Sequence, residues 1–381
     1  MRAFFRLLVL ASVAGSVALT SSFGLGTIGH GRLVGSASVR ADYDSNIFIS
    51  DTRIDDYVTT ADAALRYIRD SGILTFEAAI GATATAFLDH KNENSFDPFF
   101  EGKMGYSPSD KTTMRGNIAF RRTSVANEQV NDRTQSNDFL LDGSFEHLTS
   151  EKLGLRFLGN YSHSAYHTAG YSDVLSYGLC AHAVHVYSPK LKLLAGVTVL
   201  EWWTDDRSPG RRSPSSNDIR YSVGAEGELA PKVSGDVNIG YVQRDFDSTG
   251  FGDAGALYLS SRVAWSATEK TTWSLVLSQN FGVSAADQSV KTLSATLNLR
   301  RKFTEKLNFD SSVGADRSTY TSFNNIGNRK DDGYVIRGRL NYLFKDNITM
   351  DVSTGYRDND SDLAVSTYDR FNIGAGLSVR F

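Results

Sequence analysis

Charged side chains occupy every second position of several otherwise apolar segments, and this spacing defines the chemistry that the sequence offers. Arg337 and Arg339, for example, alternate with Ile336, Gly338 and Leu340. Because successive side chains of a strand point to opposite faces, such a segment has one apolar face and one charged face. Guanidinium and carboxylate groups on a wet surface attract or repel ions, so we interpret them as a field that selects solutes by charge.

The candidates for this role are the charged residues at the polar positions of the alternating segments. They are Arg115, Arg121, Arg156, Arg262, Arg300, Arg337, Arg339, Arg370, Glu226, Asp310 and Asp351, and the same pattern adds Arg220, Arg244, Glu228, Asp236 and Asp316. The mixed sign argues against steep ion selectivity, whereas Arg300, Arg337 and Arg339 favour anionic or hydroxyl-rich solutes. The alternative is that these charges pair across strands and only stabilise a solvated wall.

One acidic stretch superficially resembles a calcium loop. Asp42, Asp44 and Asn46 share a face. A calcium loop of the EF-hand type needs Gly at its sixth position and Glu at its twelfth, and Ile47 and Arg53 stand there instead. We therefore expect these side chains to order a loop through hydrogen bonds rather than to hold an ion.

A group of histidines also invites a metal hypothesis, since His163, His167, His182 and His185 lie in one predicted hairpin. Alternation sends His182 to the face opposite His163 and His185, so the rings do not converge on one ion. The single Cys180 excludes an internal disulfide, and no G-x-S-x-G motif occurs. We predict no metal, no cofactor, no catalytic residues and no enzymatic activity.

The elements that position the charged residues are strands joined alternately by short turns and longer polar segments. Longer segments include 125–135 and 204–217, and the latter is the best candidate for a loop that folds inward, although an exposed mobile loop is the expected form. Eight short turns and nine longer loops join eighteen strands. The turns recur about every 40 residues, at 69–72, 107–111, 149–152, 188–190, 230–232, 268–270, 304–306 and 345–347.

The final segment shows why these strands belong in a membrane. From Phe371 to Phe381 every odd position is apolar and every even position is polar or small. A strand in lipid must pair all its backbone amides, which requires a closed sheet. Runs of about 11 to 15 residues are too long for propeller blades. We predict an all-β fold, a transmembrane, antiparallel, up-and-down β-barrel with short periplasmic turns and longer extracellular loops.

Composition and the N-terminal residues agree with this fold. The mean hydropathy of −0.27 is expected for a barrel in which half of the strand side chains face water. Residues 1–22 run from basic to apolar to small, which is typical of a secretory signal peptide; cleavage after Ala18 and after Ser22 both remain open. The single barrel domain then covers residues 33–381. The net charge of −3 does not favour nucleic acid as a partner.

The C-terminal residues Gly376, Val379 and Phe381 resemble the assembly signal of Gram-negative outer-membrane barrels. The usual first position of that signal is polar, and Gly374 departs from it. The resemblance implies that the barrel assembly machinery is a partner and that the lipid bilayer of the bacterial outer membrane is the location.

A second resemblance lies near the N-terminus, in the segment from Ala41 to Phe48. Its residues Asp42, Tyr43, Asp44, Asn46, Ile47 and Phe48 resemble the opening motif of the "putative beta-barrel porin 2" family. That family is often linked with exopolysaccharide or capsule export, and the resemblance implies a passive outer-membrane porin for hydrophilic solutes or polysaccharide. The alternative is a non-conducting barrel that anchors or displays its extracellular loops. Monomer and trimer both remain open.

Overall fold

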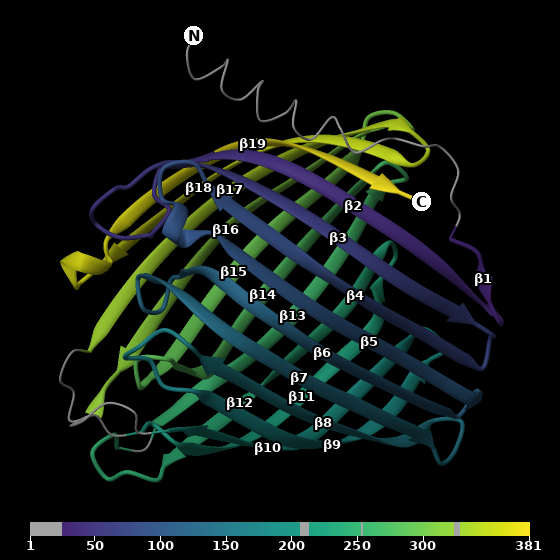
Figure 1. Ribbon diagram of the computed structural model, residues 1–381. Coiled ribbons are helices and arrows are strands. Elements are labelled where there is room, and N and C mark those ends of the chain that lie inside the picture. Colours follow the sequence, from purple (N-terminus) through teal and green to yellow (C-terminus); the bar gives the residue numbers. More distant parts are fainter. Residues whose placement is uncertain (1–24, 206–212, 253, 324–327) are drawn as a thin grey trace.

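Strands β2 to β19 follow one another around a closed antiparallel wall in the computed structural model, which describes residues 25–205, 213–252, 254–323 and 328–381. β19 pairs with β2 from Arg380 opposite Ser36 to Asn372 opposite Asp44, so the sheet has no free edge. Figure 1 shows this closure where yellow β19 runs beside purple β2. The predicted barrel of eighteen strands is confirmed.

The strands of the wall contain between 13 and 17 residues. Their bounds are β2 Gly31–Asp44, β3 Asp56–Asp70, β4 Leu74–Phe87, β5 Ser95–Ser109, β6 Thr112–Asn127, β7 Asp132–Leu148, β8 Leu153–Tyr166, β9 Val174–Ser188, β10 Leu191–Thr204, β11 Ser216–Ala230, β12 Val233–Phe246, β13 Ala254–Thr268, β14 Thr271–Ser284, β15 Gln288–Lys302, β16 Leu307–Thr321, β17 Arg329–Lys345, β18 Ile348–Ser361 and β19 Tyr368–Arg380. A two-residue strand, β1 (Thr27–Ile28), pairs only with β2, and the 3-10 turns η1 (Lys91–Glu93) and η3 (Ala364–Ser366) lie in loops.

The short turns gather at one end of the barrel, here called the turn end. In several of them a hydroxyl accepts a hydrogen bond from the backbone N–H of a lysine two residues later, which stabilises the reversal. These pairs are Ser150 with Lys152, Ser188 with Lys190, Thr268 with Lys270 and Thr304 with Lys306. The other connections lie at the opposite end, here called the loop end.

One predicted loop is wrong. Residues 125–135 are largely strand, because β6 continues to Asn127 and β7 begins at Asp132. Their polar side chains interrupt the apolar pattern, but a strand that extends beyond the hydrocarbon no longer needs an apolar outer face. The result is a long hairpin whose tip, residues 127–132, projects past the wall.

Apolar side chains cover the outer face of the wall. Ile80, Leu179 and Ile336 are 61%, 73% and 55% exposed in the protein alone, which fits a surface that lipid covers. No helix in the described residues is long and apolar enough to cross a membrane.

Most of the buried core lies at the loop end, although Val184, Leu194 and Ile348 are buried near the turn end. The most deeply buried side chains include Ile47, Ile49, Ser172, Ser284 and Arg244, and they come from loops or from strand residues close to loops. The predicted signal peptide, residues 1–22, lies outside the described residues. The wall itself starts at Gly31.

Candidate functional site in the charged lumen

Ion pairs that skip a strand identify the inner face of the barrel. Arg40 on β2 reaches over β19 to Asp351 on β18, with Nη1 and Oδ2 2.5 Å apart. Arg357 on β18 reaches over β17 to Asp316 on β16, at 2.7 Å. Side chains two strands apart meet readily on the concave face, because curvature brings them together there and spreads them on the convex face. These arginines and aspartates therefore point into the lumen.

Glycines on the skipped strands make room for these pairs. A Cβ at Gly376 on β19 would lie 2.7 Å from Oδ1 of Asp351, and a Cβ at Gly333 on β17 would lie 2.6 Å from Nη2 of Arg357. Both distances are shorter than van der Waals contact. Gly376, predicted as part of the assembly signal, thus also opens a passage for the Arg40–Asp351 pair.

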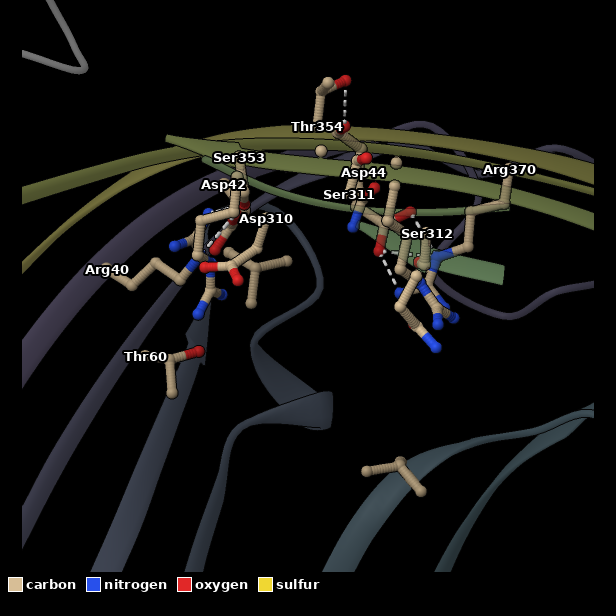
Figure 2. Close-up of a pocket in the computed structure, with 18 of the residues that line it drawn as sticks. Arg40, Asp42, Asp44, Thr60, Asp310, Ser311, Ser312, Ser353, Thr354 and Arg370 are labelled. Atoms are coloured by element: carbon tan, nitrogen blue, oxygen red, sulfur yellow. Dashed lines mark hydrogen bonds and ion pairs between the residues drawn. The ribbon is translucent and has the colours of Figure 1, made fainter. Parts of the chain in front are cut away.

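A cavity of about 1080 Å³ lies in the lumen and is lined by residues of β13 to β19, β2 to β4, β6 and β7. Figure 2 shows side chains from β2, β16, β18 and β19 projecting into it. Of the predicted candidates, the residues that line it are Arg262, Arg300, Arg337, Arg339, Arg370 and Asp310. Sequence reasoning missed Arg40 and Arg133, which line the same cavity. The alternation of Arg40 with Val39 and Ala41 was a usable signal for the first.

The arginines of the cavity differ in how closely each is paired with an acidic side chain. Nε of Arg300 lies 2.8 Å from Asp310, and Arg370 pairs with Asp44. Arg339 stands 3.6 Å from Asp351, whose carboxylate already holds Arg40. The wall therefore contains both neutralised and available guanidinium groups.

The remaining predicted charges lie elsewhere on the inner wall. Arg156 on β8 bridges Glu146 on β7 and Glu226 on β11, with Nη1 2.8 Å from Glu226, and Lys192 also contacts Glu146. This compact cluster has equal numbers of positive and negative charges, so it fits the interpretation that the charges stabilise the wall.

Two further candidates are more exposed. Arg121 pairs with Glu101 at 2.9 Å. Arg115 is exposed and has no ion pair within the described part of the chain. Neither residue lines the cavity described above.

The predicted opening motif links the cavity to the first loop. Asp42 and Asp44 line the cavity, and Tyr43 faces outward beside Tyr57, with ring centroids 5.4 Å apart. The Asn46 N–H donates to Asp44 Oδ1 at 3.0 Å, and its side-chain amide donates to the Ser50 carbonyl at 2.8 Å. The motif thus orders the loop by hydrogen bonds.

Its apolar members complete this loop. Ile47 is 1% exposed, and Phe48 packs edge-on against His90 with ring centroids 5.9 Å apart. At the other terminus, Val379 pairs with Ile348 and Ala37, and the Phe381 N–H donates to the Gly35 carbonyl at 3.0 Å.

The tip of the β6–β7 hairpin crosses the mouth of the barrel at the loop end. Arg329 on β17 donates to the Asn131 side chain and to the Gln129 carbonyl, both at 2.9 Å. Arg357 on β18 contacts Glu128 at 3.0 Å. β7 and β17 stand far apart around the wall, since β2 to β6 and β18 and β19 separate them on the shorter side. These contacts therefore pass across the opening.

A second bridge crosses the same mouth. In the β8–β9 loop, the Ser172 N–H donates to the Ala285 carbonyl at 2.9 Å, and its hydroxyl donates to Asp287 at 3.0 Å, both in the β14–β15 turn. Tyr171 of the same loop donates to Asp132 of the hairpin at 3.2 Å. Loops thus extend over the lumen at this end. Of the segment 204–217, predicted as the best candidate for an inward loop, residues 206–212 lie outside the described residues.

The described residues contain no group of three or more His, Cys, Asp and Glu side chains arranged to hold a metal ion. His182 lies on the inner face, where its Nε2 is 3.4 Å from Cys180 Sγ and where Gly196 provides space for its ring.

A closed antiparallel barrel with an apolar outer wall and a charged inner wall is the architecture of porin-like outer-membrane proteins. The family described as "putative beta-barrel porin 2" matches residues 27–381. The chain belongs to this family and lies in the bacterial outer membrane.

Two solved structures are similar to this chain, and the first of them supports the fold. OpdK of Pseudomonas aeruginosa, solved with vanillate, superposes with a TM-score of 0.50 at 8% identity, covering 92% of this chain and 99% of that chain. The siderophore receptor PirA of Pseudomonas aeruginosa gives 0.46 at 11% identity, covering 92% and 80%. No curated protein matches the sequence.

Proposed function

We propose that the protein is an outer-membrane pore through which hydrophilic solutes pass passively. The observation that carries the proposal is the cavity of about 1080 Å³, whose lining is rich in arginine, aspartate, serine and threonine. An interior of this polarity beside an apolar outer wall favours water inside the barrel and lipid outside. The role proposed is not enzymatic.

A narrower form of the proposal makes the pore the outer-membrane component of an exopolysaccharide export system. The family resemblance motivates it, and the hydroxyl and amide groups of the cavity offer hydrogen bonds to sugars. Liposome swelling with neutral and anionic oligosaccharides tests it. Exclusion of both by vesicles that admit small ions would contradict the narrower form and leave the pore itself standing.

The second candidate function is a non-conducting barrel that anchors or displays its loops. The contacts of Arg329 and Ser172 across the loop end favour it, because they narrow the mouth. Planar bilayer recording discriminates the two candidates. The pore proposal predicts stepwise currents from correctly folded protein, and the absence of current at every voltage would overturn it.

The charged wall adds a prediction about ion preference. Replacing Arg337 and Arg339 by alanine removes two positive charges from the cavity, so we expect a weaker preference for anions. The measurement is the reversal potential in a salt gradient, and an unchanged value would contradict the role given to these residues.

We also propose that residues 1–22 are removed during export and that the barrel assembly machinery inserts the chain. The order of basic, apolar and small residues within 1–22 supports the first part, and Phe381, whose backbone pairs with Gly35 at the seam where the barrel closes, supports the second. Deleting Phe381 should lower the amount of folded barrel in the outer membrane, measured by heat-dependent gel mobility. Normal insertion of the shortened chain would argue against this signal.

A further inference from the structure

Two arginines that line the cavity, Arg262 and Arg337, form no ion pair or side-chain hydrogen bond within the described residues. Their neighbours differ, because Asp236 of β12 stands directly opposite Arg262, whereas Ser312 and Gly355 stand opposite Arg337. The acids nearest Arg337 and Arg339 are engaged with other arginines. Asp310 holds Arg300 at 2.8 Å, and Asp351 holds Arg40 at 2.5 Å.

The charge balance of the cavity leads to Arg337. Its lining contains seven arginines and three aspartates. Two more acids outside the lining, Asp351 and Glu93, pair with Arg40 and Arg133 of the lining. These five acids compensate five of the guanidinium groups, and Asp236 stands opposite a sixth, Arg262, which leaves one positive charge in excess. This excess stands inside a chain whose formal net charge is −3.

The register separates Arg262 from the other two arginines. Counting across β13 to β17, Arg262 stands level with Val335 but four strands away, which is about 19 Å along the sheet. Arg337 and Arg339 share the inner face of β17, and Arg339 is 3.6 Å from Asp351. Two residues along a strand span about 7 Å, so one ligand can contact both guanidinium groups of β17.

The neutral groups beside these arginines indicate how the rest of a ligand would be held. Hydroxyl and amide side chains dominate, among them Asn298, Ser312, Ser353 and Asn372. Among the described lining residues the one aromatic ring is Phe87, which is 5% exposed and covered by Arg133 at 4.7 Å. Recognition here relies on hydrogen bonds and charge, because no open ring surface is offered for stacking.

We propose that Arg337 and Arg339 form a binding site for hydroxylated carboxylates of the sugar-acid class. This inference deepens the proposed pore and rests on its water-filled lumen, but binding itself requires no current. The arginines bind the carboxylate through charge-assisted hydrogen bonds, and the serine and asparagine side chains bind the hydroxyls. A neutral sugar of the same size lacks the first of these interactions.

The direct test is isothermal titration of glucuronate into the folded full-length barrel in detergent, with glucose as the neutral probe. The test variant combines Arg337→Gln with Arg339→Gln. The control is Arg317→Gln, which removes one positive charge from a residue that is 66% exposed on its side chain and paired with Asp332 at 2.6 Å, away from the cavity. A lysine pair, Arg337→Lys with Arg339→Lys, restores the charge.

We expect glucuronate to bind at least about tenfold more tightly than glucose, and the double glutamine variant to lose about tenfold or more in affinity. The control and the lysine pair should stay near the wild-type affinity. Equal binding of glucose and glucuronate, or an unchanged affinity in the double glutamine variant, would overturn the site. Bilayer recording separates this outcome from the pore proposal. Binding without current removes the pore alone, and current without binding removes the site alone.

Discussion

Removal of the Arg329 side chain should open the loop end of the barrel. Arg329 is 5% exposed, and its guanidinium donates two hydrogen bonds to the hairpin tip at Asn131 and Gln129 and a third to Ser366 at 2.8 Å. It also stacks on Tyr320, 3.9 Å from the ring centroid. The arginine therefore joins β17 to a hairpin from the far side of the mouth.

The size of the effect follows from the two bonds that reach the hairpin. A hydrogen bond to a charged group contributes about 1.5 to 3 kcal/mol, and water replaces part of this when the hairpin lifts. A net loss of about 3 kcal/mol is then expected for Arg329→Ala. Since each 1.4 kcal/mol is a factor of about ten, the ratio of open to closed hairpin should rise roughly 150-fold.

Single-channel recording measures this change as more frequent or longer openings. Arg329→Ala also leaves Asp331 without its partner at 3.2 Å, so a second variant should weaken the contact from the hairpin side. Asn131→Gly suits this purpose, because Asn131 has a φ of +52° that glycine adopts without strain. Arg317→Ala, which breaks an exposed ion pair elsewhere, serves as the control. If both test variants fold and conduct like the wild type, the hairpin does not control the opening.

Two further predictions concern stability. Arg244 is fully buried and donates hydrogen bonds to both carboxylate oxygens of Asp218 at 2.7 Å. Arg244→Leu should therefore lower the free energy of unfolding by about 3 to 5 kcal/mol, and adding Asp218→Leu should recover part of this loss. Thermal unfolding in detergent measures both changes, and full stability of the single variant would contradict the prediction. Gly374→Ala places a Cβ 1.9 Å from Asp42 Oδ1 and should lower the free energy of unfolding by about 1 to 3 kcal/mol in the same measurement. The control Gly116→Ala should have little effect, because no atom lies nearer than 3.9 Å to its Cβ. Equal losses of stability in the two variants would contradict the steric argument.

The barrel was predictable from the sequence because its determinants are local. Alternation along each strand assigns an inner and an outer face, and turn spacing counts the strands, as the segment around Arg337 and the turn at Lys270 illustrate. A bilayer requires every strand to pair its backbone amides and to face lipid on one side, so every strand shows the same alternation as its neighbours.

The partners of the inner charges were not predictable in the same way. Arg156 pairs with Glu226 three strands away, and Arg40 reaches Asp351 only because Gly376 leaves space between them. Such pairs depend on the register and curvature of the closed sheet, which no single segment encodes. The contacts of the hairpin tip were even less predictable from the sequence. The tip has the polar composition of a loop, and its contacts with Arg329 lie across the mouth of the barrel.

The two ends of the barrel therefore contribute differently to any passage of solute. Arg300 and Asp310, close to the turns, and Asp44 and Arg133, close to the loops, line one cavity. The contacts of Arg329 cross the loop end beyond it. A solute that enters from the turn end meets the charged wall before it meets the hairpin, so selection by charge precedes passage through the narrowed mouth. For a solute moving outward, the mouth is the last barrier, because the contacts of Arg329 lie eight residues along β17 from Arg337.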